Sequence, residues 1–365
     1  MRSVGALVAV GLALGAALGT ALSSAAAVAD TPTGDDGGRA PWVVGPALLK
    51  PMTKEIFSHL RERAPMVPEP KIESRNLAQE VQLFCSGAGV DTPDVLSMTR
   101  RMGVSEFQLC VKNGVADIIE VQVGMEALVL ARRKQDADLP MTFDTFYRAI
   151  AAELPKGDDF LPNTAQTWHD LDPRLPKTEI SVMVPSRATF SRPYFDNRFL
   201  QGACREIFEF KNIYSAEERV AQCIGLRRDG RVLELGLPIT PETILAAMNK
   251  APRGTVIVLS MRYAMEMADT FKVLPLEGVV PDRTTVSHQD YPATRSVVYY
   301  VKRAHVKDHA GNGPVLGLRE FITEMTRESA IGDTGYLVQL GLVPLPEAKR
   351  AEVRRSALAL SPMSR

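Results

Sequence analysis

The sequence has no excess of charge of either sign. Its 365 residues include 43 Lys and Arg and 43 Asp and Glu. Proteins that bind nucleic acid or an anionic membrane surface usually carry a basic excess on the face that they use. We therefore expect neither kind of partner.

Motifs that mark common enzyme classes are also missing. The sequence has no GxxxxGK[ST] or GxGxxG loop for a nucleotide and no GxSxG turn for a hydrolase. The acidic residues are scattered, and no two of them have a spacing that indicates an acid and a base. We expect no enzymatic activity and no cofactor.

Only one pair of histidines has a spacing that suits metal ligands on one helix. His305 and His309 are four residues apart, but the glutamate of HExxH is missing and Lys307 lies between them. We expect this pair to lie on a solvated surface, and we predict no metal site.

Apart from the N-terminus, the chain lacks an apolar run long enough to cross a membrane. A basic start, small apolar residues over 4–22 and a small-x-small end at Ala27–Ala29 are typical of a secretory signal peptide. We predict that residues 1–29 are cleaved before Asp30 and that residues 30–39 are a flexible N-terminus. An uncleaved membrane anchor is the alternative.

Cysteine is scarce but even in number: Cys85, Cys110, Cys204 and Cys223. An exported chain meets an oxidising compartment, which favours disulfides. Sequence alone allows three connectivities, and we predict the local one, Cys85 with Cys110 and Cys204 with Cys223. Each such loop contributes roughly 3 kcal/mol in the chain-entropy model. A zinc site is the weaker alternative, because no CxxC or nearby His supports it.

Short apolar runs alternate with amphipathic ones along the chain. The predicted strands are 42–44, a segment around Ile72, 94–98, 118–123, 127–131, 179–184, 255–259 and 296–301. The predicted helices are 47–63, one ending at Phe84, 105–112, 142–154, 195–208, 216–223, 241–250, 315–327 and 347–358.

Strands that alternate with helices indicate an α/β fold with mostly parallel sheets. We expect Thr142 and Thr240 to cap the helices that follow them, and residues 156–175 to form a surface insertion. The length exceeds what one hydrophobic core usually supports, so two lobes or domains are expected.

Several blocks of sequence, in order and with the cysteines in register, resemble one known family, the periplasmic phosphate-binding proteins of ABC importers (PstS family) in its cysteine-containing form. The resemblance covers nearly the whole mature chain and is strongest over 82–131 and 291–361. The blocks are Leu83-Phe84-Cys85-Ser86-Gly87, 91–94, 100–102, 105–107 with Cys110, Lys112-Asn113-Gly114-Val115, 291–292, 299–306, 317–321, 335–337 and 341–346.

This resemblance implies a two-lobed periplasmic binding protein fold of type II with two crossovers between the lobes. Lobe one would be 40–131 and 293–365, and lobe two 132–292. In the family a bare phosphate lies between the lobes, held by hydroxyls, an Arg and backbone N–H groups at helix N-termini. An inner-membrane ABC permease is the implied partner, and the periplasm the implied location.

The loops that would hold the ligand depart from the family pattern. The first reads Gly45-Pro46-Ala47-Leu48-Leu49, which has no hydroxyl, and Pro46 has no N–H. The second, residues 74–79, has Leu77 where a hydroxyl is expected. The lobe-two loop, residues 189–193, keeps two hydroxyls and the Arg but has Phe190 in place of a Gly.

Several polar side chains remain that could form a looser anion site for phosphate or a related or altered anionic solute. These candidates are Arg192, Ser191, Thr189, Thr99, Arg100, Arg75 and Ser74. Each lost charge-assisted hydrogen bond removes roughly 1.5–3 kcal/mol, so we expect phosphate binding to be weakened.

The apolar replacements Leu48, Leu49, Leu77 and Phe190 have two open interpretations, core packing or a more apolar cleft. The alternative function is a scaffold or interaction protein that kept the fold and lost transport. An enzyme that uses the cleft lacks any motif.

Overall fold

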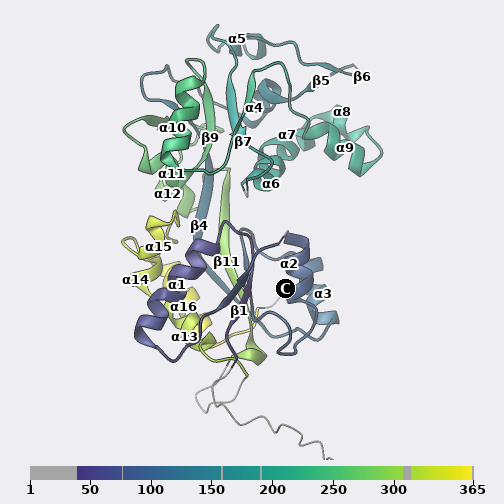
Figure 1. Cartoon of the computed structure of the whole chain (residues 1–365). Helices are drawn as coiled ribbons and strands as arrows, with labels where there is room; N and C mark the ends of the chain where they lie inside the picture. The colour runs from purple at the N-terminus through teal and green to yellow at the C-terminus, as the bar shows by residue number, and fades with distance from the viewer. Residues whose placement is uncertain (1–38, 76, 158, 190, 307–313, 364–365) are drawn as a thin grey trace, which may run out of the picture. The chain divides into compact units, whose positions relative to one another are not determined.

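The computed structural model describes residues 39–363, apart from 76, 158, 190 and 307–313 (Figure 1). The predicted signal peptide, nearly all of the predicted flexible N-terminus and His309 therefore lie outside the described residues. The chain from Gly38 onward forms one compact unit. Within the described ranges, no helix is both long enough and apolar enough to cross a bilayer.

The strands form one large sheet and a separate two-stranded hairpin. They are β1 (Trp42–Val44), β2 (Lys71–Glu73), β3 (Val95–Met98), β4 (Ile118–Arg133), β5 (Glu153–Lys156), β6 (Asp159–Pro162), β7 (Val182–Pro185), β8 (Val232–Leu235), β9 (Val256–Ser260), β10 (Phe271–Val273) and β11 (Thr294–Lys302).

Helices surround the sheet. They are α1 (Lys50–Arg63), α2 (Leu77–Phe84), α3 (Val104–Lys112), α4 (Phe143–Ile150), α5 (Trp168–Leu171), α6 (Arg192–Phe195), the π-helix η1 (Asp196–Gln201), α7 (Gly202–Glu206), α8 (Phe208–Lys211), α9 (Ala216–Cys223), α10 (Pro241–Lys250), α11 (Met261–Glu266), α12 (Arg283–Ser287), the 3-10 helix η2 (Arg303–His305), α13 (Leu318–Met325), α14 (Glu328–Ile331), α15 (Tyr336–Gln339) and α16 (Glu347–Leu358).

The large sheet has the order β2-β1-β3-β11-β4-β9-β7-β8, with β10 also paired to β4. The pairs β1–β2, β1–β3, β7–β8 and β7–β9 are parallel, whereas every pair made by β4 or β11 is antiparallel. The α/β fold class is confirmed, but the expectation of mostly parallel pairing was wrong. Two long strands run against their neighbours because they connect the two ends of the sheet.

The β2–β4 end of the sheet has a helix layer on each face. Along β11, Val297, Tyr299 and Val301 belong to one buried cluster, and Val298 and Tyr300 to another. This alternation follows from the period-2 geometry of a strand, and the β-branched and aromatic run suits it. Figure 1 shows α1, α13 and α16 on one side of these strands and α2 and α3 on the other.

The other end of the sheet is organised around a single buried cluster. Its members lie between Met125 and Ala293, joined by Val343 and Leu345 from the C-terminal segment. Residues of β4 up to Val123 thus pack in the two clusters at the β2–β4 end, whereas those from Met125 onward pack in this third cluster. The proposed lobe boundary near residue 131 stays a prediction.

Gly124 does not divide β4. The sequence predicted two strands, 118–123 and 127–131, on either side of this glycine, but one strand runs from Ile118 to Arg133, with an irregular register opposite Val297 and Val298. A Cβ atom on Gly124 would lie 2.6 Å from the Leu342 side chain and 2.8 Å from the Val343 carbonyl. The glycine therefore permits a close approach of the C-terminal segment and does not mark a turn.

The helix predicted over 142–154 is shorter than expected. Thr142 caps it as predicted, since its hydroxyl accepts the Thr145 N–H at 3.0 Å. The helix ends at Ile150, and Glu153–Lys156 pairs with Asp159–Pro162 as a hairpin that lies partly in the predicted insertion. Thr240 likewise caps α10.

Both predicted disulfides are confirmed. Cys85 is bonded to Cys110 and Cys204 to Cys223, and none of the four cysteines is free. The first bond joins α3 to the end of α2, and the second joins α7 to α9. Each therefore fixes one local helix pair.

His305 is buried and does not lie on a solvated surface, so that prediction was wrong. It is 1% exposed, its Nδ1 lies 2.6 Å from a carboxylate oxygen of Asp94, and its Nε2 lies 2.9 Å from the Ala88 carbonyl. The neighbouring Lys302 is also buried and donates to the Thr92 hydroxyl; burial lowers the pKa of its ammonium to about 8. The side chain of His305 therefore belongs to a polar network inside the protein.

Candidate functional site

Three parallel strands, β7, β8 and β9, end at the same edge of the sheet. Their last residues are Pro185, Leu235 and Ser260. In open α/β sheets, ligands bind outside the carboxyl ends of the strands. A cavity of about 250 Å³ lies at this edge.

The cavity is lined mainly by apolar side chains. Its lining consists of Leu48, Leu128, Pro185, Thr189, Ser191, Leu235, Leu237, Pro238, Ile239, Val258, Leu259, Ser260 and Tyr263. None of these residues carries a charge. The polar groups that they offer are three aliphatic hydroxyls and a phenol, and the phenol of Tyr263 already donates to the Ile239 carbonyl at 2.7 Å.

Two of the predicted anion-site residues, Thr189 and Ser191, line this cavity. The Thr189 hydroxyl donates to the Ser186 carbonyl at 2.8 Å, so it holds its own turn. Ser191 precedes α6 but makes no side-chain cap. Of this pair, Ser191 has the hydroxyl that is available to a ligand.

Arg192 lies beneath the same loop and does not line the cavity. It is 3% exposed, and its Nε donates to Asp196 at 2.5 Å while its Nη1 donates to Glu234 and to the Pro185 carbonyl. Its Nη2 is buried without a hydrogen-bond partner in the described part of the chain. The pKa of Asp196 is raised because its burial outweighs the effect of this arginine.

The first ligand loop of the family pattern, residues 45–49, packs closely against the rest of the protein. Leu49 is fully buried in the core, whereas Leu48 lines the cavity, so the two leucines have different roles. The backbone N–H of Leu49 donates to the Pro46 carbonyl. A Cβ on Gly45 would meet the Ser97 hydroxyl at 1.9 Å, so the loop lies directly against β3.

One backbone amide of the second loop is already engaged. The backbone N–H of Arg75 donates to Glu80 at 2.8 Å, and the side chains of Ser74 and Arg75 are exposed. Glu80 is fully buried, and burial raises the pKa of its carboxyl to about 7. Leu77 packs against the core, which favours the core interpretation for this residue.

In the third segment, residues 99–100, the charged side chain is also paired. Arg100 makes a two-pronged pair with Glu106, at 2.8 and 2.5 Å, and this hydrogen bonding raises the pKa of the guanidinium. Thr99 is half-buried beside it. Thr99, Arg100, Ser74 and Arg75 do not line the cavity.

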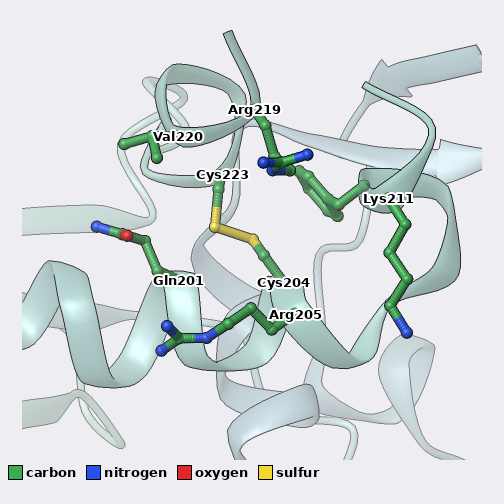
Figure 2. Close-up of a pocket in the computed structure, with 8 residues that line it drawn as sticks. Gln201, Cys204, Arg205, Lys211, Arg219, Val220 and Cys223 are labelled. Atoms are coloured by element: carbon green, nitrogen blue, oxygen red, sulfur yellow. A yellow bond between two sulfur atoms is a disulfide. The ribbon is translucent and has the colours of Figure 1, made fainter. Parts of the chain in front are cut away.

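A second pocket, of about 400 Å³, has a different character. Figure 2 shows the Cys204–Cys223 disulfide with Arg205, Lys211 and Arg219 around it. Phe210, Gln201 and Val220 complete the lining. This pocket combines three cations with an apolar floor and lies on the α7–α9 segment, away from the strand ends.

Residues 51–329 match the family model described as the PBP superfamily domain. The chain belongs to the PBP superfamily. No curated protein matches the sequence.

Solved structures of the same fold cover nearly all of this PBP superfamily protein. A possible phosphate binding protein from Planctomyces limnophilus shares 15% identity at a TM-score of 0.62, covering 89% of this chain and 99% of the other. PstS from Borrelia burgdorferi shares 12% at 0.55, covering 84% and 99%. An ABC-type phosphate transport receptor from Vibrio cholerae shares 11% at 0.55, covering 84% and 100%. These likenesses confirm the periplasmic binding protein fold.

The sequence did not predict two parts of the cavity in this superfamily member. Leu235 ends β8, and Leu237 and Ile239 follow it; this strand was missed because its Val-Leu-Glu-Leu run is short and half-buried. Ser260 ends β9, which was predicted over 255–259, and Tyr263 follows it. Residues at or directly after the end of a predicted buried strand could thus have been named as cavity candidates from the sequence.

Proposed function

We propose that this protein is the solute-binding component of an ABC importer of the phosphate type. The observation that carries this proposal is the cavity at the carboxyl ends of β7, β8 and β9, in a chain with the fold of phosphate transport receptors. A binding component of this kind has no catalytic role, which agrees with the absence of catalytic motifs from the sequence.

The proposal places the mature protein in the periplasm, after cleavage before Asp30. Two disulfides within the described chain support an oxidising compartment. N-terminal sequencing of protein recovered from the periplasm tests this. A mature start at residue 30 is expected, and an intact Met1 in the membrane fraction would contradict it.

We further propose that residues 40–131 with 293–365 and residues 132–292 form two lobes that close on the solute. The buried clusters support this, because one lies mostly between Met125 and Ala293 and the other two use the remaining segments. The two crossovers would be β4 and β11, whose hydrogen-bonded pairing allows small rotations.

The phosphate named for the relatives makes a small anion the first ligand to test, with Arg192, Ser191 and Thr189 as the lobe-two candidates and Thr99, Arg100, Arg75 and Ser74 as the lobe-one candidates. Calorimetric titration of the mature protein with phosphate, other anions and apolar solutes tests the function. Binding of any one solute supports a receptor. Binding of none supports the alternative, a scaffold that kept the fold.

An inner-membrane ABC permease is the proposed partner. Crosslinking the mature protein to membranes of its own source should capture a permease subunit. No such product under conditions that preserve other importers would count against transport.

A further inference from the structure

We infer that the cavity at the strand ends accepts an uncharged, mainly apolar solute with one or two hydrogen-bonding groups. This inference rests on the proposed solute-binding function and names its substrate class. It begins with the lining, in which Lys, Arg, His, Asp and Glu are all absent from the residues that form the cavity.

The shape of the lining separates an apolar floor from an accessible rim. Leu128, Val258 and Leu259 are buried at the floor, while Leu237 is 57% exposed at the rim. An apolar cavity of about 150 Å³ stays dry and binds benzene. The present cavity, of about 250 Å³, is therefore large enough for a compact ring system.

Two hydroxyls give the cavity a limited polar function. Ser191 and Ser260 both lie at helix starts, and neither makes a side-chain cap there. A hydroxyl can donate one hydrogen bond and accept two. They would satisfy one or two polar atoms of a ligand and so fix its orientation, but they bring no countercharge.

An anion has no comparable place at this edge. Arg192, the arginine that follows the lining residue Ser191, does not line the cavity and is paired with two carboxylates, those of Asp196 and Glu234. Its one free donor, Nη2, is buried, and the pair of acids already exceeds its single charge. An ion moved from water into such a site would lose its hydration without gaining a partner charge.

Two polar groups of the loops that would contribute from the other side are likewise engaged. Glu80 occupies the Arg75 amide, Glu106 occupies the Arg100 guanidinium, and Pro46 offers no N–H. The contribution of the first loop to the cavity is the apolar side chain of Leu48. Both sides of the site thus favour an apolar ligand.

Two probes with one ring system separate the ligand classes. At neutral pH 2-naphthol is uncharged, and 2-naphthoate carries the same rings with a carboxylate. Titration of the mature protein, followed by calorimetry, should show that 2-naphthol binds at least about tenfold more tightly than 2-naphthoate or inorganic phosphate.

Leu237→Glu places a carboxylate at the exposed rim, where folding tolerates it, and should weaken 2-naphthol binding by about tenfold or more. Met66→Glu is the matched control, because Met66 is also exposed, at 75%, and does not line the cavity. Binding in this control should equal that of the wild type. Unchanged 2-naphthol binding in Leu237→Glu would overturn the inference.

The outcomes also separate this inference from the proposed function. Preferential binding of phosphate or 2-naphthoate would overturn the inference and leave the receptor function standing. If Arg219→Ala abolished that anion binding, the anion would lie in the pocket of Figure 2. An apolar solute in the strand-end cavity would then not be the main ligand of the protein. Binding of none of the three probes, nor of the wider panel, would overturn both.

Discussion

The loops around residues 45, 75 and 100 differ from the strand-end cavity in how their polar groups are bonded. In the loops around residues 45, 75 and 100, polar groups are present but are bonded to other parts of the protein. In the cavity, polar groups are few, and two hydroxyls have no helix-capping role. The fold is thus kept in a chain in which the Arg75 amide and the Arg100 guanidinium are bonded within the protein.

The largest expected effect concerns Arg192. Arg192→Met leaves the half-buried Asp196 beside an apolar side chain, which should lower the free energy of unfolding by about 2–3 kcal/mol in urea titrations. The double variant Arg192→Met/Asp196→Leu should recover part of this loss, and Arg187→Met, at an exposed arginine of the same loop, should change little. A stable Arg192→Met protein that loses anion binding would instead identify Arg192 as a ligand residue.

Glu80 gives the next effect, through pH. Its pKa is about 7 in the folded protein against an ordinary 4.5, so the folded state keeps a proton that the unfolded chain releases. Its stabilising contribution is fully present below the ordinary pKa and is lost as the pH rises through the folded value. Relative to Glu80→Gln, the wild type should lose roughly 3 kcal/mol of unfolding free energy between about pH 4 and about pH 8.5.

The measurement is a series of urea unfolding curves for both proteins across that range. Curves that stay parallel would show that Glu80 does not retain its proton, and the description of the second loop would then be wrong.

Gly45 tests how tightly the first loop is packed. Gly45→Ala forces a methyl group against Ser97 and should cost about 2 kcal/mol. Gly87→Ala is the control, since its added Cβ would meet only Thr92, at 3.9 Å. Equal thermal midpoints for the two variants would mean that the loop can move away from β3 at little cost.

The smallest effect is expected at Arg100. Its pair with Glu106 is exposed, so Arg100→Ala should cost less than about 1 kcal/mol. Arg174→Ala, which removes another exposed arginine pair, should behave alike. Loss of phosphate affinity in Arg100→Ala alone would show that this loop still contacts a ligand.

Much of the fold could be predicted locally. Capping residues and amphipathic periods placed α9, α10 and α16 at their observed bounds, because these signals lie within a few residues of the helix ends. The cysteine count and the exported context led to the correct disulfides. β4 was divided in error, since the reason for Gly124 is contact with Leu342, more than 200 residues away in sequence.

Less of the candidate site than of the fold could be predicted from the sequence. The loop residues Thr189, Ser191 and Arg192 were singled out from the family pattern, yet only the first two line the cavity. Arg192 was predicted to be an anion-site residue, and His305 was predicted to lie on a solvated surface. Their burial beside Asp196 and Asp94 depends on elements that meet only after folding.

The sequence by itself determined the fold class and the family, because these depend on local periodicity and long ordered blocks of residues; it left three cysteine connectivities open, and the structure confirmed the local one. Only the tertiary structure decided which polar groups remain free. That outcome depends on which carboxylate reaches which arginine or amide across the fold, as Glu234 reaches Arg192 and Glu80 reaches Arg75. The apolar character of the cavity follows from the same cause, since residues from five separate segments meet at the ends of three strands.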